Sequence, residues 1–298
     1  MCWVGNAMSR RIVSSRAQRP QIIHSLPTLA RRLAQWRARR ERIGLVPTMG
    51  ALHAGHLALV KRAQRRADRV IVSIFVNPTQ FAPSEDLKTY PRTFAADVTA
   101  LARIGADLVW APTVETMYPH GFATRVVPEG PATVGLEDAF RPHFFAGVAT
   151  VVAKLFIQCD ADVAAFGEKD YQQLKVVTQM ARDLDLKTRI LAVPTVRERD
   201  GLALSSRNAY LSASERTTAP TLHRVLVECA DNITSGQAIG RALTEGRGTL
   251  ARAGFGVDYL EARNADSLAP VQSAKDGQLR LLVAARLGKT RLIDNIAV

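Results

Sequence analysis

Short apolar, β-branched runs alternate with helix-forming segments along the first two thirds of the chain, and this alternation constrains the fold more than any other feature. The runs are short enough for buried strands, whereas the segments between them place apolar residues at the period of an amphipathic helix. Strands and helices in this order form a parallel sheet with right-handed crossovers. The sequence predicts strands at residues 43–46, 70–76, 107–111 and 162–166, with helices at 56–66, 94–103 and 170–183.

After Leu186 the pattern changes, which indicates a second, smaller unit of mixed α+β character. A β-rich run at 188–196 leads into the polar loop RERDGLALSSRN, and a helix is expected from 212 to about 230. A glycine-rich helical segment and short strands at 257–262 and 280–284 follow. The expected parts are a tail at 1–20, a parallel-sheet domain at 21–189 and a C-terminal domain at 190–298.

The net charge of +13 is confined to the N-terminal part of the chain, because residues 1–69 hold 15 Arg and Lys against 2 Asp and Glu, while residues 70–298 hold 25 of each kind. Residues 1–20 show no sustained apolar period, and we expect a mobile basic tail there. Such a tail can contact RNA or a membrane surface, but a charge run without a recognition motif is more often solvated. We therefore expect neither a nucleic-acid nor a membrane partner.

Cysteine usage and hydropathy exclude several classes of protein. The three cysteines, Cys2, Cys159 and Cys229, have no paired spacing, which argues against a disulfide scaffold or a zinc site and suits a reducing cytosol. The apolar runs are far shorter than the roughly 18 residues that span a bilayer. We expect a cytoplasmic protein with room for a sizeable core.

The segment PTMGALHAGH at residues 47–56 predicts a phosphate site. It follows an expected strand and opens an expected helix, whose first N–H groups are unpaired and attract anions. It has neither the Lys-Ser/Thr ending of a P-loop nor the G-x-G-x-x-G of a dinucleotide fold. His53 and His56 are able to donate to phosphate oxygens instead. Two histidines at this spacing also bind metals, but no third ligand at metal spacing lies nearby in the sequence.

Two further segments add phosphate-binding groups. FGEKDYQQ at 166–173 places Lys169 at a helix mouth, where an ammonium neutralises phosphate, with Asp170 as a helix cap or a ribose ligand. LSSR at 204–207 supplies two hydroxyls and a guanidinium that suit a triphosphate. Taken alone, a charged helix start is commonly a cap, and a surface Ser-Ser-Arg run commonly has no function.

Neutral amides predict a pocket for a small acid. FVNPTQF at 75–81 carries Asn77 and Gln80 at the carboxyl end of an expected strand, where open α/β folds place ligands. Gln173 lies one helical turn after Lys169 and can face the same cleft. These amides suit the hydroxyl and carboxylate groups of a small acid, although Asn-Pro also commonly builds a turn.

Taken together, six segments resemble the pantoate–β-alanine ligase (pantothenate synthetase) family in order and spacing, over about residues 21–298. They are PTMGALHAGH, VSIFVNPTQF, DLKTYPRT, FGEKDYQQL, DGLALSSRNAYLS and LVAARLGKTRLIDN. The resemblance implies a Rossmann-like nucleotidyltransferase domain, a smaller C-terminal domain that closes over the active site as a lid, and a cytoplasmic homodimer. It also implies ATP-dependent condensation of (R)-pantoate with β-alanine through a pantoyl adenylate, with release of pyrophosphate and AMP.

The resemblance also assigns roles to residues of the phosphate site. His56 is the implied proton donor, and His53, Lys169 and Arg207 act beside it. We prefer electrostatic stabilisation of the phosphorus by both histidines, because adenylation of a carboxylate needs no obvious proton transfer. The implied ATP-binding residues are Met49, Gly50, Ala51, Leu52, His53, Ala54, Gly55, His56, Gly167, Glu168, Lys169, Asp170, Val196, Leu204, Ser205, Ser206 and Arg207.

The same resemblance assigns the acid and metal sites. Gln80 and Gln173 would hold pantoate, with Asn77 in the same pocket. Mg²⁺ would bridge the phosphates, and Asp97, shortly after the YPRT run, is the acid expected nearest to it.

Two features depart from the family pattern. One is the basic tail at 1–20. The other is RPHFFAGV at 141–148, where the family usually reads RPGHFRGV, so that the histidine is displaced by one position and the arginine is replaced by Ala146. If that arginine steadies the pocket, activity or affinity is altered in this chain.

Two other classes of protein share part of the pattern. A different nucleotidyltransferase with the same H-x-G-H loop is one, and the amides of the acid pocket disfavour it. A protein that binds RNA through its basic tail, with an idle enzyme site, is the other. The presence of every phosphate-site residue disfavours that class.

Overall fold

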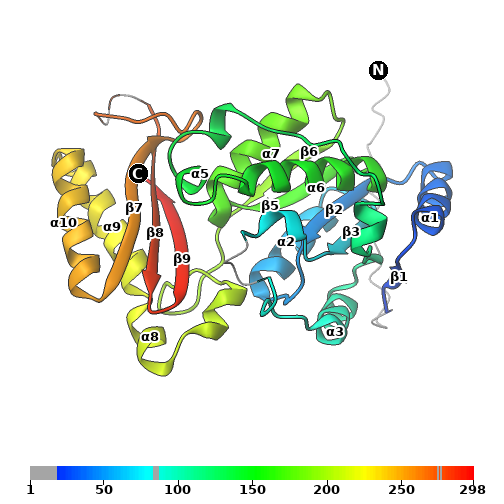
Figure 1. Ribbon diagram of the computed structural model, residues 1–298, viewed down its shortest axis with the longest axis horizontal. Helices are drawn as coiled ribbons and strands as arrows, with labels where there is room; N and C mark the ends of the chain where they lie inside the picture. Colours follow the sequence, from blue (N-terminus) through cyan, green and yellow to red (C-terminus); the bar gives the residue numbers. More distant parts are fainter. Residues whose placement is uncertain (1–18, 83–86, 274, 276) are drawn as a thin grey trace, which may run out of the picture.

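A computed structural model describes residues 19–82, 87–273, 275 and 277–298, and it contains a six-stranded parallel sheet and a three-stranded antiparallel sheet (Figure 1). The expected tail lies outside the described residues except for Arg19 and Pro20. The strands of the parallel sheet, in the order in which they pair, are β1 (Gln21–Ile23), β4 (Leu108–Trp110), β3 (Arg69–Ile74), β2 (Ile43–Thr48), β5 (Val163–Gly167) and β6 (Arg189–Val193).

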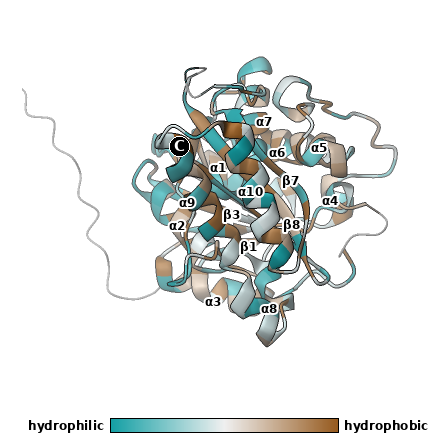
Figure 2. Ribbon diagram, turned by 90° about the vertical axis from the view of Figure 1, so that its left-hand side faces the viewer, coloured by the Kyte–Doolittle hydropathy of each residue, from teal (hydrophilic) through white to brown (hydrophobic). Residues whose placement is uncertain are grey.

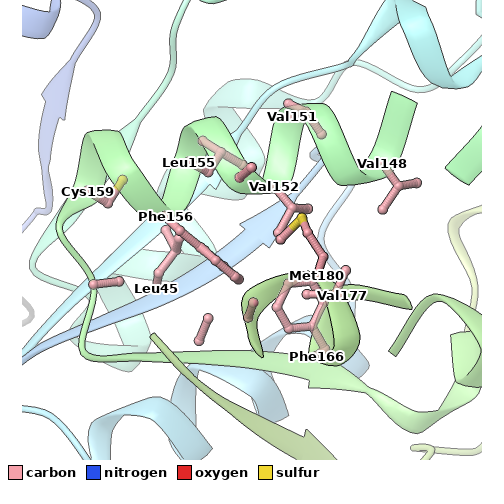
Figure 3. Close-up of a cluster of buried hydrophobic side chains, with 14 of the residues drawn as sticks. Leu45, Val148, Val151, Val152, Leu155, Phe156, Cys159, Phe166, Val177 and Met180 are labelled. Atoms are coloured by element: carbon pink, nitrogen blue, oxygen red, sulfur yellow. The ribbon is translucent and has the colours of Figure 1, made fainter. Parts of the chain in front are cut away.

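Helices cover both faces of the parallel sheet, because successive residues of each buried strand point to opposite faces. Leu45 of β2 belongs to a core with the helices α1, α6 and α7, whereas Val46 belongs to a second core with α2 and α3. In Figure 3, Phe156 of α6 lies close to Phe166 of β5, and their ring centroids are 6.2 Å apart. The helices of this part are α1 (Leu26–Ala38), α2 (Ala54–Gln64), α3 (Phe94–Ile104), α4 (Val114–Met117), α5 (Glu137–Phe140), α6 (Phe144–Cys159) and α7 (Tyr171–Asp183).

The C-terminal part has its own core between an antiparallel sheet and two helices. Leu226 of α9 and Leu250 of α10 pack with Leu260 and Leu281 of the sheet. In Figure 2 the inner strands β3 and β8 carry apolar colour, consistent with the burial of most of their residues. The elements are α8 (Ala213–Thr218), α9 (Thr221–Thr234), α10 (Ile239–Arg252), β7 (Phe255–Asn264), β8 (Leu279–Leu287) and β9 (Thr290–Ala297).

The α/β fold with a smaller α+β part is confirmed, and the differences from the sequence prediction have physical causes. Helix α6 was not predicted; it is apolar over most of its surface, and only a narrow polar stripe of Thr150, Lys154 and Gln158 marks its helical period. The helix expected from 212 is interrupted by Pro220, where α9 begins after α8. Strands β1 and β9 were also not predicted. The expected boundary between residues 189 and 190 falls inside β6, which pairs with β5, so the parallel sheet ends at Val193.

The topology fixes where a ligand site forms. From β2 the chain proceeds to β3 and β4 on one side, and later continues through β5 and β6 on the other side. The connections that leave β2 and β5 therefore diverge at neighbouring carboxyl ends, which is where open α/β sheets bind ligands. The segments PTMGALHAGH and FGEKDYQQ are these two connections.

Candidate active site

A cleft of about 970 Å³ opens at the carboxyl ends of β2 and β5. Its wall combines the turns after these strands, the loop after β6, the start of α6 and the β8–β9 hairpin. The predicted residues in the lining are Met49, His53, Gly55, His56, Gln80, Gly167, Lys169, Asp170, Gln173, Val196, Leu204, Ser205, Ser206 and Arg207. The predicted residues that are not part of this lining, although all are described, are Gly50, Ala51, Leu52, Ala54, Asn77, Asp97 and Glu168.

Asp97 holds the turn that follows β2. One of its carboxylate oxygens accepts from the backbone N–H of Ala51 at 3.0 Å, and the other accepts from the N–H of Leu52 at 2.9 Å and from Thr93 Oγ1 at 3.1 Å. Its exposed fraction is only 3%. Gly50 has a φ of +85°, and a Cβ there would lie 3.2 Å from the Asp97 carboxylate, so glycine suits this position. A magnesium role for Asp97 would have to displace these contacts.

His53 and His56 cap the first turn of α2 with their Nδ1 atoms. Nδ1 of His53 accepts from the N–H of Gly55 at 3.2 Å, and Nδ1 of His56 accepts from the N–H of His53 at 3.3 Å. A nitrogen that accepts carries no proton, so each neutral ring keeps its proton on Nε2. Both side chains line the cleft, and the two Nε2–H groups are donors of the kind that phosphate oxygens accept.

Burial keeps both imidazoles uncharged. It lowers the pKa of His53 to about 4, with a further lowering from the positive charge of Lys169. Burial also lowers the pKa of His56 to about 3, assisted by His53 and Lys169. Near pH 7 the pair therefore offers neutral donors to the cleft, and the positive charge beside it belongs to Lys169.

The turn after β5 is held by the C-terminal sheet. Asn295 of β9 donates through Nδ2 to the carbonyls of Glu168 at 2.9 Å and Lys169 at 2.8 Å. The Glu168 carboxylate accepts from Arg280 Nη2 at 3.1 Å. Glu168 was expected to bind the nucleotide, but its side chain is engaged with this sheet. The ammonium of Lys169 lies 3.7 Å from Asp170 Oδ1, and both residues line the cleft.

The loop after β6 brings the LSSR segment to the same cleft. The N–H of Leu204 donates to the Val196 carbonyl at 3.0 Å, which places the two predicted residues side by side. Ser205 Oγ accepts from the N–H of Arg207 at 3.2 Å, and Ser206 Oγ lies 3.3 Å from the Tyr90 hydroxyl. The loop therefore presents its hydroxyls from a fixed backbone.

Sequence reasoning missed two polar groups of this loop. Thr195 Oγ1 and Asn208 Oδ1 are buried atoms for which the described part of the chain supplies no hydrogen-bond partner, and both residues line the cleft. Buried polar atoms are normally paired, so these two suit a ligand or water in the cleft. Thr195 belongs to no motif that the sequence distinguishes, whereas Asn208 lies in DGLALSSRNAYLS directly after the LSSR run, which is the signal that could have identified it.

Gln80 and Gln173 lie on the wall where the acid was expected. Gln80 ends a short 3-10 helix, η1 (Pro78–Gln80), and Gln173 lies in the first turn of α7. Asn77 is buried behind Gln80, with an exposed fraction of 1%, and donates through Nδ2 to Gln80 Oε1 at 3.0 Å. Its place is therefore behind the wall rather than in it.

The departure at 141–148 affects one side of the cleft only. Arg141 stacks on Phe144, with its guanidinium carbon 3.7 Å from the ring centroid, and donates to the Gln80 carbonyl at 3.0 Å. Both residues line the cleft, whereas Ala146 is not part of the lining. The backbone at Gly147 passes so close to η1 that a Cβ would lie 2.4 Å from the Thr79 carbonyl oxygen.

The described residues contain neither a membrane-spanning helix nor a ready metal site. No helix among them is long and apolar enough to cross a bilayer. No group of three or more His, Cys, Asp or Glu side chains within residues 19–298, apart from the undescribed gaps, is arranged to hold a metal ion.

Comparison with known proteins identifies relatives over nearly the whole chain. The sequence profile described as Pantoate-beta-alanine ligase matches residues 21–297. Pantothenate synthetases of Nitrobacter hamburgensis and Rhodopseudomonas palustris are 63% and 62% identical over 279 residues, which is 94% of this chain and 99% of each relative.

Solved structures agree with this result. The crystal structure of pantothenate synthetase from Thermus thermophilus superposes with a TM-score of 0.86 at 47% identity, covering 93% of this chain and 98% of that one. Pantoate-beta-alanine ligase from Francisella tularensis, complexed with beta-gamma ATP and beta-alanine, gives a TM-score of 0.77 at 33% identity, covering 93% and 97%. The motifs, the cleft and these relatives together show that the chain belongs to the pantoate–β-alanine ligase family of enzymes.

Proposed function

We propose that this protein condenses (R)-pantoate with β-alanine at the expense of ATP and releases pantothenate, AMP and pyrophosphate. The observation that carries the proposal is that one cleft is lined both by phosphate-binding groups and by two neutral amides. His56, Lys169 and Arg207 represent the first set, and Gln80 and Gln173 the second. Family membership and the ATP and beta-alanine complex of the Francisella relative support the same reaction.

The first step forms an acyl adenylate. A carboxylate oxygen of pantoate attacks the α-phosphorus of ATP, and the bond from that phosphorus to the bridging oxygen breaks, so that pyrophosphate leaves. Negative charge spreads over the phosphorus oxygens in this step, and pre-oriented donors stabilise it. The Nε2–H groups of His53 and His56, together with the Lys169 ammonium, are suited to that role.

The second step transfers the acyl group. The amine of β-alanine attacks the activated carbonyl carbon, loses a proton, and the bond from carbon to the AMP oxygen breaks. The free carboxylate could not react in this way because oxide is a poor leaving group. The protein contributes position and charge stabilisation in both steps and needs no covalent nucleophile.

Magnesium would neutralise the phosphates in this chemistry. The described residues do not fit a protein-held ion, because both Asp97 oxygens already accept hydrogen bonds and no cluster of ligands is present among them. We therefore propose that magnesium accompanies ATP as its phosphate complex and that Asp97 shapes the turn.

Release of AMP tests the function. Purified protein with ATP, magnesium and (R)-pantoate should release AMP in the presence of β-alanine, with pantothenate formed in equal amount. His56→Ala should lose this activity. A wild-type protein that releases no pantoate-dependent AMP or pyrophosphate would refute the proposal.

We also propose that the protein is a homodimer in the cytoplasm, as the family resemblance implies. Light scattering on a size-exclusion column would test the first statement, because the 32.5 kDa chain would elute with about twice that mass as a dimer. Cell fractionation would test the second.

A further inference from the structure

We infer that Tyr118, which is not part of the cleft lining, is a positioning residue that sets the direction of the Gln80 amide. Tyr118 follows α4, far from Gln80 in sequence, and acts through the buried Asn77. This inference rests on the proposed function, because it assigns Gln80 the task of donating to an oxygen of the acid substrate.

The side-chain amide of Asn77 can take only one orientation. Its oxygen accepts from the Tyr118 hydroxyl at 2.9 Å, from Thr79 Oγ1 at 3.0 Å and from the Thr79 N–H at 3.3 Å. Its nitrogen donates to the Gly147 carbonyl at 3.2 Å. Rotating the amide by half a turn would bring an N–H against the Thr79 N–H and an oxygen against the Gly147 oxygen, and both contacts are repulsive.

The orientation of Asn77 determines that of Gln80. Asn77 Nδ2 also donates to Gln80 Oε1 at 3.0 Å, which engages the oxygen end of the Gln80 amide. The NH₂ end of Gln80 is then the end that can serve a ligand in the cleft. A carboxylate or hydroxyl oxygen of the acid would accept from it.

Tyr118 fixes the orientation of the Asn77 and Gln80 amides from outside the η1 turn. Thr79 belongs to the same η1 turn as Gln80, so its two hydrogen bonds move with the turn, whereas Tyr118 approaches from another element. The Tyr118 ring is held against Phe75 and Phe122, with centroid distances of 6.2 and 5.1 Å. Burial raises the pKa of the Tyr118 phenol, so it remains a donor at all working pH values.

The test compares Tyr118→Phe with the wild type. The aromatic packing is kept and one hydroxyl is lost, so the KM for (R)-pantoate should rise about 3- to 10-fold while the KM for ATP stays unchanged. Thr188→Val is the matched control, because its buried hydroxyl donates to the Ala161 carbonyl at 2.8 Å at the opposite ends of the strands. It should leave both KM values unchanged.

A double-mutant cycle separates positioning from general damage. In a Gln80→Ala background, Tyr118→Phe should have no further effect on the KM for pantoate, because the group through which it acts is absent. An additional rise of the same size in that background, or an unchanged KM in Tyr118→Phe alone, would overturn the inference.

A spectroscopic measurement keeps this inference separate from the proposed function. In ¹⁵N-labelled protein without substrate, Tyr118→Phe should shift the side-chain NH₂ signals of Asn77 and Gln80 and speed their hydrogen exchange. Unchanged signals would overturn the positioning role even if the wild type proved to lack ligase activity. If the wild type has no ligase activity but Tyr118→Phe still produces these shifts, the proposed reaction is refuted and the positioning role of Tyr118 stands.

Discussion

Nδ1 of His56 accepts a hydrogen bond from the backbone N–H of His53 at 3.3 Å, so the two histidines that we propose bind phosphate also form the cap of helix α2. The observed capping role and the proposed phosphate role involve different nitrogen atoms of each ring. Nδ1 serves the helix, and Nε2 is the atom left for a ligand. This division makes the two functions separable by substitution.

His53→Asn should separate capping from catalysis. Asparagine is a good N-cap, and its oxygen can replace Nδ1 toward the Gly55 N–H, but it supplies no donor at the position of Nε2. We expect kcat to fall by about 100-fold, as for the loss of one preorganised donor, with little change in melting temperature. His53→Ala should lose the same activity and about 1 kcal/mol of stability as well. Equal melting temperatures for the two variants would contradict the capping role.

The pH dependence should lack an ionisation at the ordinary histidine pKa. The pKa values of about 4 for His53 and about 3 for His56 lie below the usual 6.5, so both rings stay neutral and their Nδ1 caps stay intact down to about pH 5. A profile of kcat/KM reports the free enzyme, and its acid limb should fall below pH 5. An acid limb with an apparent pKa near 6.5 that disappears in His56→Gln would contradict this.

The same shifts make a prediction for stability. Between pH 6.5 and about 4 the unfolded chain binds protons at His53 and His56 that the folded chain does not bind. Protonation therefore favours unfolding, and the contribution of these residues to stability should decline as the pH falls through this window, with no effect above pH 7. Urea unfolding of the wild type and of His56→Gln at pH 7 and pH 5 would measure it. The loss between these two pH values should be smaller in the variant.

Asp97→Asn tests whether Asp97 holds the turn after β2 or binds magnesium. The asparagine oxygen can accept from only one side, and its NH₂ group would face the N–H of Ala51 or Leu52, so the turn should loosen. We expect a higher KM for ATP and a lower melting temperature, with an unchanged magnesium concentration for half-maximal activity. A large increase in that magnesium concentration would instead assign Asp97 to the metal.

Two substitutions in the segment 141–148, which departs from the family pattern, should have contrasting effects on the KM for pantoate. Phe144→Leu removes the ring under the Arg141 guanidinium, so the contact from Arg141 to the Gln80 carbonyl should loosen. The KM for pantoate should then rise about 3- to 10-fold, the range expected for a partly buried cation–π contact. Ala146→Arg restores the family residue outside the cleft lining and should change this KM little. A large gain in activity from Ala146→Arg would show that the substitution in this chain is costly.

The sequence predicted those parts of the fold and the site that depend on a local pattern of residues. The strand-turn-helix at PTMGALHAGH and the buried strands followed from local pattern, and the topology brought the predicted segments to one cleft. The sequence could not predict side-chain roles that depend on contacts between residues far apart in the chain. Glu168 pairs with Arg280, and Asn77 turns its amide toward Tyr118 and Gln80; both partnerships arise only after folding. The neutral state of the histidines likewise follows from burial, which no motif encodes.

A last prediction concerns how the C-terminal sheet is attached. Arg291 of β9 donates through both terminal nitrogens to the carboxylate of Glu137, at 2.7 and 2.9 Å, and Glu137 has an exposed fraction of 6%. The Tyr259 hydroxyl donates to the same carboxylate at 2.8 Å. Arg291→Met would leave the buried carboxylate with only the more distant Arg141, whose Nη1 lies 3.9 Å from it, so the free energy of unfolding should fall by about 3 to 5 kcal/mol.

Two comparisons make that prediction specific. Adding Glu137→Gln to Arg291→Met should recover part of the loss, because the buried negative charge is then gone. Arg216→Met breaks the exposed pair of Arg216 with Asp200, where the N–O distance is 2.6 Å, and should cost less than about 1 kcal/mol. Urea unfolding of all three variants is the measurement. If Arg291→Met cost no more than Arg216→Met, the Glu137 contact would not fasten the sheet, and the contacts of Asn295 and Arg280 with the turn after β5 would be what attaches it.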